Sequence, residues 1–425
     1  MVSKATDYKV SALGRIPSHW NIRPLNELFE EVNQRKGDND YPILSCTKDG
    51  IVPQSEHFNK RVASEDDSQY KVAKYGDLVV SGLNLHLGGI DVQTLVPAGA
   101  VSPAYYVFRK VSGEVDLKFI QYLLRSEKYI QFYDTQVTQI GASIVRRSTP
   151  RSKVKSLPVI LPPLPEQRKI ADILTSVDDA IAATQRIIDQ TERVKRGLMQ
   201  QLLTRGIGHT KFKKTEIGEI PAEWDVAQIG KMCQTTSGGT PKRSVKAYYE
   251  NGTIPWIKTG ELGIKYIYNS EERITDEAVR NSSAKILPQN TVLVAMYGAT
   301  IGKSSILKIE AATNQACCAI LCDEKKVHHE FLYYILSFRK DELVNLGAGG
   351  AQPNISQQLI KRFSIPIPPI EEQRQIAVIL ARIDDKLQHE HKTLQTYSSL
   401  KVSLMNVLLT GKVRVKVDEQ AEAVV

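Results

Sequence analysis

Two stretches of the chain repeat apolar residues with the spacing of a coiled-coil helix. Their inward positions step by four and three residues in turn through five consecutive heptads, which is the period of helices that pack along one seam. The first series is Ile170, Leu174, Val177, Ile181, Thr184, Ile188, Thr191, Lys195, Leu198 and Leu202, and the second is Ile376, Leu380, Ile383, Leu387, Glu390, Leu394, Tyr397, Lys401, Leu404 and Leu408. Polar residues in the middle of each series would fix the register at some cost in stability. The pattern predicts two long helices with one seam each.

Proline and glycine mark the ends of both predicted helices. Proline is tolerated only at or before the first turn of a helix, and glycine often follows the last turn. Prolines stand at 162, 163 and 165 and at 366, 368 and 369, and glycines at 206 and 411. Each helix should then contain about 40 residues and measure about 60 Å. Neither can bury its seam alone, so we expect the helices to pair, antiparallel, with the segments that precede them at opposite ends.

The two helical series belong to a tandem duplication of the chain. Residues 163–179 return as residues 369–385, at an offset of 206 positions. The segment 13–20, Leu-Gly-Arg-Ile-Pro-Ser-His-Trp, is answered by 217–224, Ile-Gly-Glu-Ile-Pro-Ala-Glu-Trp. By this symmetry, the N-terminal segment should lie where the second helix ends, which gives a circular arrangement.

Between the repeated frames lie two inserts that share a coarse pattern but differ in their loops. The first pair of matched stretches is typical of buried strands, the second pair matches in sequence, and the third pair has the apolar spacing of a helix. The pairs are 75–81 with 290–296, 100–108 with 312–320, and 119–124 with 331–336. We expect one fold in both inserts, with recognition residues in the loops.

The predicted fold class is α+β: two mixed α/β domains joined by two long antiparallel coiled-coil helices, with an internal pseudo-twofold repeat. The expected parts are an N-terminal segment (1–20), a first domain (21–160), a first helix (161–205), a connector (206–224), a second domain (225–365), a second helix (366–411) and a tail (412–425). At 425 residues the chain is long enough for several domains that each bury a core.

Charge favours a polyanionic partner without requiring one. The net charge is +9 at neutral pH, and the sequence pI is near 9.1. Such a balance suits nucleic acid, although a solvated positive face would account for it equally well.

The cysteines and the N-terminus predict a cytoplasmic protein. The five cysteines form no Cys-x-x-Cys pair, which argues against a zinc framework or a disulfide scaffold. The first residues lack the apolar core of a signal peptide, and no run of eighteen apolar residues occurs. The histidines, including His328 and His329, lack His-Glu-x-x-His spacing, so we expect them to be solvated and predict no metal site.

A glycine-rich stretch at residues 298–304, Gly-Ala-Thr-Ile-Gly-Lys-Ser, resembles a phosphate-binding loop but has one residue too few between its glycines. The residues that follow, 305–309, have a strand pattern and not the helix that such a loop must begin. We predict a tight turn that presents Tyr297 and Lys303, and no nucleotide hydrolysis.

Three loops carry side chains suited to DNA. Residues 237–243, Ser-Gly-Gly-Thr-Pro-Lys-Arg, should form a flexible glycine turn with two cations for phosphate or guanine contacts. In the loop before the second helix, Gln352 and Asn354 have amides that can contact adenine, and the matched loop offers Arg146 and Arg147. An ordinary surface loop would explain any one of them alone.

No motif for covalent catalysis is present. The sequence lacks the Asp/Asn-Pro-Pro-Tyr/Phe element of amino-methyltransferases and the Gly-x-Ser-x-Gly nucleophile turn. We therefore expect a protein that is not an enzyme.

Taken together, the chain resembles the DNA-specificity subunit of a type I restriction-modification enzyme. The resemblance rests on the doubled Pro-Pro-x-x-Glu-Gln-x-x-Ile-Ala-x-Ile-Leu-x-x-x-Asp-Asp frame, the doubled Gly-x-Ile-Pro-x-x-Trp element and the Gly-Gly-Thr-Pro loop at 238–241. It covers essentially the whole length, and the ordered duplication makes it specific.

The resemblance implies a non-catalytic protein whose two target-recognition domains each bind one half of a split double-stranded DNA sequence. The helices would set the spacing and dock two methyltransferase subunits, and restriction motor-nuclease subunits would complete the complex. S-adenosylmethionine, ATP and Mg²⁺ would then bind to the partner subunits, with no cofactor in this chain and no membrane. A coiled-coil scaffold that never recognises DNA is the alternative.

The predicted DNA-binding residues combine the loops above with weaker candidates in the first domain. Because that domain lacks the Gly-Gly-Thr-Pro and Gln-Pro-Asn elements, the sequence gives weaker support for its DNA contacts. The full set is Lys48, Asn84, His86, Arg146, Arg147, Gly239, Thr240, Lys242, Arg243, Lys258, Thr259, Tyr297, Lys303, Gln352 and Asn354.

Overall fold

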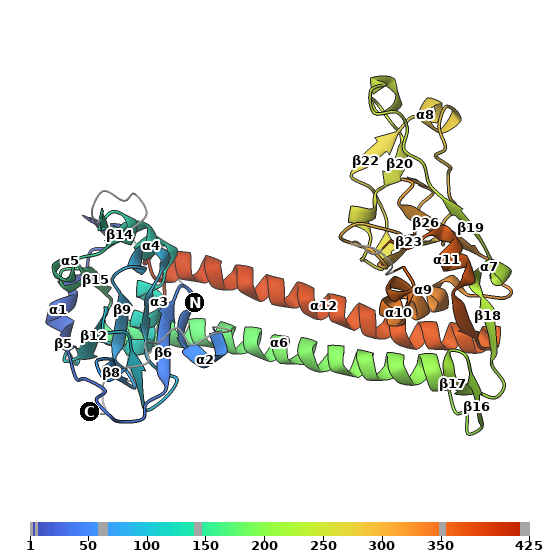
Figure 1. The fold of residues 1–425 in the computed structure, drawn as a ribbon. Helices are drawn as coiled ribbons and strands as arrows, with labels where there is room; N and C mark the ends of the chain where they lie inside the picture. Colours follow the sequence, from blue (N-terminus) through green and yellow to red (C-terminus); the bar gives the residue numbers. More distant parts are fainter. Residues whose placement is uncertain (1–2, 5–6, 58–66, 140–146, 348–353, 417–425) are drawn as a thin grey trace. The chain divides into compact units, whose positions relative to one another are not determined.

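The computed structural model describes residues 3–4, 7–57, 67–139, 147–347 and 354–416. The chain divides into two compact units, which we call unit 1 (residues 1–185 and 392–425) and unit 2 (residues 186–391). Each unit contains one half of helix α6 (Leu164–Arg205) and one half of helix α12 (Ile370–Leu408). Figure 1 shows both long helices, α6 in green and α12 in red.

The long helices have the predicted lengths and the predicted seams. Helix α6 has 42 residues and α12 has 39. Every position of both heptad series is buried or half-buried, and in each unit the halves of α6 and α12 run antiparallel. Gly206 and Gly411 follow the two helices and both have φ near +67°, a backbone conformation that glycine adopts without strain. The coiled-coil prediction is therefore confirmed.

Unit 1 is built around two four-stranded sheets in the orders β10-β9-β12-β5 and β7-β6-β11-β8. In the first sheet β9 pairs antiparallel with both β10 and β12, and in the second β11 pairs parallel with β6. The strands are β5 (Phe29–Val32), β6 (Ile43–Thr47), β7 (Gly50–Pro53), β8 (Lys71–Lys74), β9 (Leu78–Ser81), β10 (Ile90–Val92), β11 (Ala98–Val101) and β12 (Tyr105–Lys110).

Unit 2 repeats this plan with one more strand in its main sheet and one fewer in its second sheet. Its sheets have the orders β19-β26-β23-β24-β21 and β22-β20-β25, and β20 pairs parallel with β25 as β6 does with β11. The strands are β19 (Cys233–Ser237), β20 (Ile254–Ile257), β21 (Tyr266–Ile267), β22 (Glu272–Ile274), β23 (Val292–Ala295), β24 (Ser304–Leu307), β25 (Ala312–Thr313) and β26 (Cys317–Cys322). The buried strands predicted within 75–81 and 290–296 are confirmed by β9 and β23, while the matched stretches 100–108 and 312–320 each contain a turn between two strands.

Short helices flank the sheets of both units. Unit 1 contains α1 (Leu25–Leu28), α2 (Gln54–His57), a 3₁₀ turn at Leu85–Leu87, α3 (Leu117–Leu124), α4 (Glu127–Asp134) and α5 (Arg151–Lys155). Unit 2 contains α7 (Ile229–Met232), 3₁₀ turns at Lys246–Tyr248 and Thr259–Glu261, α8 (Asp276–Arg280), α9 (His329–Phe338), α10 (Lys340–Asn345) and α11 (Gln357–Arg362). The helices at 119–124 and 331–336 were both expected, and they lie in α3 and α9.

Two-stranded pairings complete each unit. In unit 1 they join β1 (Ser3–Lys4) to β28 (Val413–Arg414), β2 (Tyr8–Ser11) to β3 (Gly14–Pro17), β4 (Asn21–Pro24) to β15 (Pro158–Leu161), and β13 (Thr138–Gln139) to β14 (Arg147–Ser148). In unit 2 they join β16 (Phe212–Thr215) to β17 (Gly218–Pro221) and β18 (Asp225–Gln228) to β27 (Ser364–Ile367).

The doubled Gly-x-Ile-Pro-x-x-Trp element has the same surroundings in both units. In unit 1, Nε1 of Trp20 donates to Glu166 at the start of α6 over 3.1 Å. In unit 2, Nε1 of Trp224 donates to Glu372 at the start of α12 over 3.0 Å. Both indoles are fully buried, so each hydrogen bond satisfies a donor that would otherwise be costly to bury. The boundaries of the predicted domains stay predictions.

Hydrophobic clusters join the sheets and short helices of each unit to its helix halves. The largest cluster of unit 1 contains Ile170 and Leu174 of α6 together with Leu408 of α12. In unit 2 the corresponding cluster contains Ile376 and Leu380 together with residues at the end of α6. Among the described residues, no helix is both long enough and apolar enough to cross a membrane.

Candidate DNA interface

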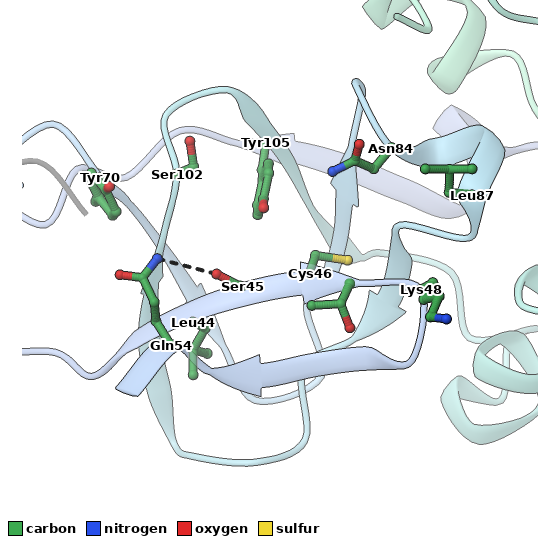
Figure 2. Close-up of a pocket in the computed structure, with 11 residues that line it drawn as sticks. Leu44, Ser45, Cys46, Lys48, Gln54, Tyr70, Asn84, Leu87, Ser102 and Tyr105 are labelled. Atoms are coloured by element: carbon green, nitrogen blue, oxygen red, sulfur yellow. Dashed lines mark hydrogen bonds between the residues drawn. The ribbon is translucent and has the colours of Figure 1, made fainter. Parts of the chain in front are cut away.

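The structure brings two predicted residues of the first domain together at one cavity. Lys48, in the turn between β6 and β7, and Asn84, in the loop after β9, both line a cavity of about 480 Å³. We call it the first-domain cavity, and Figure 2 shows its two walls. Residues that the sequence did not single out complete it, including Ser45, Gln54, Tyr70, Leu87, Ser102 and Tyr105.

The first-domain cavity combines uncharged hydrogen-bonding groups with one cation, Lys48. Burial raises the pKa of the Cys46 thiol to about 12, so the thiol stays neutral. Burial also raises the pKa of the Tyr105 hydroxyl, which therefore keeps its proton. Gln54 donates to the Ser45 hydroxyl over 3.4 Å (Figure 2). Asn84 and Lys48, which both line this cavity, are exposed residues.

A second cavity of unit 1, of about 390 Å³, also includes Lys48 in its lining. Its other cations have partners: Lys118 donates to Gln121, Arg125 lies 3.5 Å from Asp91, and Lys401 of α12 lies 2.6 Å from Asp178 of α6. Lys48 therefore lines both the polar first-domain cavity and this second cavity, which contains several cations.

In the second domain, Tyr297 and Asn354 line one open cavity of about 740 Å³, which we call the second-domain cavity. Tyr297 follows β23 as Asn84 follows the equivalent strand β9. Ser356 and Gln357, which the sequence did not single out, form part of its wall. Ser356 accepts from Leu359 N as the N-cap of α11, and Gln357 donates to Thr235, so this wall is held in place.

Equivalent hydrogen bonds hold Thr149 and Ile355, the residues that follow the two predicted loops. Ile355 N donates to Met296 O over 2.8 Å in unit 2, and Thr149 N donates to Gly82 O over 2.8 Å in unit 1. The loops that carry the predicted amides and arginines thus end at equivalent points of the two sheets. Arg146 and Gln352 lie outside the described residues, as does the side chain of Arg147, whose backbone belongs to β14.

The glycine-rich stretch at 298–304 forms a turn between β23 and β24, as predicted. Gly298 and Gly302 have φ of +87° and +73°, and the residues that follow form a strand. Tyr297 and Lys303 are exposed. Thr300 donates to Thr259 O over 2.7 Å, which brings the turn next to the segment of the candidate Thr259.

The turn at 237–243 differs from the flexible loop that we expected. A Cβ on Gly239 would lie 2.3 to 2.4 Å from atoms of Ser283 and Ala284, so only glycine fits. Its carbonyl accepts from Nε1 of Trp256, and the Thr240 hydroxyl donates to Gln315. Gly239 is buried, while Thr240 and Lys242 are exposed. Packing against Ser283 and Ala284 therefore fixes this turn. The sequence alone does not show that these residues lie over it.

Arg243 and Lys258 meet at one carboxylate. Arg243 lies 2.6 Å from Glu272, and Lys258 lies 2.8 Å from the same side chain. These two cations lower the pKa of Glu272. The Arg243 guanidinium also lies over the rings of Tyr249 and Trp256, at 4.5 and 5.0 Å. Both predicted DNA contacts are therefore also structural.

His86 occupies a half-buried position beside the first-domain cavity. It lies in the 3₁₀ turn Leu85–Leu87, and its Nδ1 is buried without a hydrogen-bond partner among the described residues. The cavity lining includes its neighbour Leu87 and not His86 itself.

The prediction that His328 and His329 are solvated is wrong for His329. This residue is only 8% exposed because it begins α9 against the sheet of unit 2. Burial lowers the pKa of His328, and the adjacent His329 adds to the shift. Within the described part of the chain, Glu324, His328 and His329 form one group whose side-chain atoms could hold a metal ion. No sequence motif indicated this group.

Known proteins match this architecture over nearly its whole length. A family model described as the type I restriction modification DNA specificity domain matches residues 17–193 and again residues 221–396. The MjaVIII type I restriction enzyme specificity subunit of Methanocaldococcus jannaschii is 32% identical over 423 residues, which is 95% of each chain. The putative MjaX specificity subunit of the same organism is 29% identical and covers 97% of this chain and 98% of its own.

Solved structures agree on the fold. A type I restriction-modification system structure is 18% identical with a TM-score of 0.56 and covers 93% of this chain and 99% of the matched one. The specificity subunit from M. genitalium is 14% identical with a TM-score of 0.55, covering 92% and 96%.

Two domains of one fold, each followed by a long helix and each matched by the same DNA-specificity model, define a DNA-recognition protein with two recognition domains. The chain belongs to the type I restriction modification DNA specificity family. It is therefore a sequence-specific DNA-binding subunit with two recognition domains, and the comparisons give no support to a scaffold that does not bind DNA.

Proposed function

We propose that the first-domain and second-domain cavities bind the two halves of a split DNA target. The strongest support is that each cavity contains two residues predicted to bind DNA and lies beside the loop after one of two equivalent strands. A family model that matches the chain twice is consistent with one recognition domain for each half-site. The predicted DNA-binding residues outside these cavities remain part of the proposal.

The side chains suggest a division between base and phosphate contacts. The amides of Asn84 and Asn354 can pair with adenine edges, and Tyr297 can contact a base or sugar. Lys48, beside a cationic cavity, suits a phosphate oxygen. A cation that contacts phosphate strengthens binding to all sequences, whereas an amide that contacts a base edge changes which sequence binds.

The same proposal assigns the long helices to partner subunits. The exposed Val194 of α6 and Leu400 of α12 occupy equivalent positions, 206 residues apart, and are 49% and 42% exposed. Apolar side chains at equivalent sites of the two helices suit two copies of one partner. We assign them to two methyltransferase subunits, because the matched relatives are subunits of type I restriction enzymes.

The reaction chemistry then belongs to those partners. S-adenosylmethionine would bind to the methyltransferase subunits, and ATP and Mg²⁺ to restriction motor-nuclease subunits. A cytoplasmic location follows from the same assignment and is supported by the five free cysteines of the chain.

The decisive experiment maps methylated adenines in the host genome by single-molecule sequencing, with and without this gene. We expect deletion to abolish one bipartite motif. Restoring the gene as Asn84→Ala should alter one half-site only, and Asn354→Ala the other only. An unchanged methylome in the deletion strain, with the partner genes expressed, would refute the function.

Lys213→Ala serves as a matched control, because Lys213 is exposed on β16 and lies in neither cavity. It should leave both half-sites intact. If Asn84→Ala and Asn354→Ala also left both half-sites intact, recognition would lie outside the two cavities even though the subunit still binds DNA.

Docking is tested by co-purification with the methyltransferase subunit. Val194→Asp with Leu400→Asp should abolish the complex, because a charge replaces the apolar side chain at both sites. Gln200→Asp with Asn406→Asp is the matched control, since these residues are exposed on the same helices and are also 206 positions apart. Equal complex yields for both double variants would place docking elsewhere.

A further inference from the structure

Glu324, His328 and His329 of unit 2 bring a carboxylate and two imidazoles to one point. Nδ1 of His329 lies 2.6 Å from Oε1 of Glu324, and Nε2 of His328 lies 4.0 Å from Oε2 of the same carboxylate. The centroids of the two imidazole rings are 4.8 Å apart. One ligand atom from each residue lies within 4.8 Å of the other two.

Among the described residues, each ring turns one nitrogen toward Glu324 and keeps its other nitrogen without a partner. Nδ1 of His328 and Nε2 of His329 are both buried without a hydrogen-bond partner among the described residues. They are not the nitrogens that face Glu324, so a metal bound beside the carboxylate would use Nε2 of His328 and Nδ1 of His329. Both rings turn a nitrogen toward the Glu324 carboxylate.

The first half of the chain shows how this position looks without histidine. His328 N donates to Oε1 of Gln373 over 2.9 Å, and Asp116 N donates to Oε1 of Gln167 over 2.9 Å. His328 and Asp116 are therefore equivalent. The Asp116 carboxylate caps α3 by accepting from Phe119 N, whereas His328 makes no side-chain cap to α9.

The same alignment extends to both other members of the cluster. Gln373 Nε2 donates to Lys326 O, and Gln167 Nε2 donates to Glu114 O. With this register, Ser112 stands where unit 2 has Glu324, and Leu117 stands where it has His329. The three potential ligands thus occur together in one copy and are all absent from the other.

We propose that Glu324, His328 and His329 bind a divalent transition metal ion of the Zn²⁺ class. Two imidazoles and one carboxylate are a common ligand set for zinc, which binds such atoms at about 2.0 to 2.2 Å and leaves a fourth position for water. Small rotations of three side chains would bring their ligand atoms to that separation. Glu324 supplies the negative charge that a cation needs beside a helix N-terminus, where the helix dipole disfavours it.

The role of this metal would be structural and confined to the second recognition domain. The cluster begins α9 and, through His328 N and Gln373, is attached to the start of α12. A bound ion would add a further link at the start of α9, where the Glu324 carboxylate already accepts from His329 N over 3.2 Å. Removing the ion should therefore loosen unit 2 and leave the first recognition domain unaffected.

The test measures Zn²⁺ bound to the purified full-length chain, together with its melting temperature in Zn²⁺ and in chelator. We expect one tightly held ion per chain and a lower melting temperature in chelator. Co²⁺ in place of Zn²⁺ should give the visible absorption bands of a site with histidine nitrogen ligands.

The matched variant converts the cluster to its counterpart in the first half: Glu324→Ser, His328→Asp and His329→Leu. Because the first copy folds with these residues, the variant should keep its fold, lose the ion, and melt at the same temperature with and without chelator. His389→Ala with His391→Ala, which removes two exposed histidines of α12, should change nothing. The proposal is overturned if the wild type retains no ion from a large excess of Zn²⁺, or if the triple variant retains as much as the wild type.

Discussion

Lys401 Nζ lies 2.6 Å from Oδ1 of Asp178, and this ion pair joins α12 to α6 in unit 1. The second oxygen of the Asp178 carboxylate accepts from the hydroxyl of Tyr122, on α3, over 2.7 Å. One carboxylate therefore holds both the opposite helix and the recognition domain.

Unit 2 contains the same arrangement at the equivalent positions. Lys195 Nζ lies 2.6 Å from Oδ1 of Asp384, whose other oxygen accepts from the hydroxyl of Tyr334 over 2.6 Å. The aspartates of the two units are 206 residues apart, and so are the lysines. The duplication has preserved the whole junction, which fixes the helix register within each unit.

The first prediction concerns the tyrosines of these junctions. Tyr122→Phe and Tyr334→Phe each remove a hydrogen bond to a charged group, which contributes about 1.5 to 3 kcal/mol to stability in typical proteins. Since the carboxylates are partly exposed, we expect each variant to lose about 1 to 2 kcal/mol. Urea unfolding measures this loss. Tyr75→Phe is the control, because Tyr75 is 65% exposed, and an equal loss there would contradict the junction's role.

The second prediction separates the two cations of the 237–243 turn. Arg243→Ala should lower the melting temperature, because it removes the ion pair with Glu272 and the stacking on Tyr249 and Trp256. Lys242→Ala should leave the melting temperature unchanged and reduce the salt dependence of DNA affinity by roughly one phosphate contact. Calorimetry and binding titrations at several salt concentrations test both. Full DNA affinity in Lys242→Ala would remove this residue from the interface.

The third prediction concerns the glycine after α12. Gly411 has φ +67°, and an added Cβ would lie 2.4 Å from the Pro17 ring. Gly411→Ala combines backbone strain with a clash, so it should destabilise unit 1 by about 1 to 3 kcal/mol. Gly113→Ala is the control, because nothing lies within 4 Å of its added Cβ and its φ is not positive. Similar thermal unfolding of the two variants would contradict the packing at Gly411.

The fourth prediction concerns thiol reactivity. Cys233 and Cys322 face each other on β19 and β26. A hydrogen bond from the Cys322 thiol lowers the pKa of Cys233, while the pKa of Cys46, Cys317 and Cys318 is raised to about 12 by burial. A lowered pKa places the thiolate at lower pH, so iodoacetamide should modify Cys233 first as the pH rises toward 9.

Peptide mass mapping across that pH range identifies the modified cysteine. The Cys322→Ser variant keeps a hydroxyl donor, and Cys322→Ala removes it. Alkylation of Cys233 should move to higher pH only in the alanine variant. Identical pH profiles for both variants would show that the hydrogen bond does not set the reactivity.

The fifth prediction tests whether the length of the two long helices sets the spacer between the two DNA half-sites. Deleting residues 185–191 of α6 and 391–397 of α12 removes one heptad from each helix and keeps both lysine–aspartate pairs in register. The connection shortens by about 10 Å at 1.5 Å per residue, which corresponds to about three base pairs at 3.4 Å each. The methylome should show the same half-sites with a spacer about three base pairs shorter. An unchanged spacer would show that the length of the helices does not set it.

Local sequence patterns were sufficient for much of the fold. The heptad positions predicted the buried seams, since helical periodicity depends only on neighbouring residues. Glycines 298 and 302 predicted a turn for the same reason. The matched strands could be aligned because the duplication repeats their apolar runs.

The errors and omissions concern contacts between residues far apart in the sequence. His329 is buried by packing against the sheet, which no local pattern reveals. Arg243 has Glu272 as a partner, 29 positions away, and the walls of both cavities come from separate loops. The candidate site was therefore only partly predictable: the sequence indicated suitable side chains but not which of them lie together.

The C-terminal ends of α6 and α12 repeat the same residues, and this repetition suggests how a duplicated chain of this kind could form. Leu404, Met405, Leu408 and Leu409 pack with the core of unit 1, and the same four residue types recur at 198, 199, 202 and 203, within or against the core of unit 2. Lys195 likewise repeats Lys401. A gene encoding only the first half would therefore supply every partner that Asp178 and Trp20 require, from a second copy of itself. Its product would be a symmetric homodimer with two identical readers, and the fusion of two such genes would free each half to acquire its own DNA target.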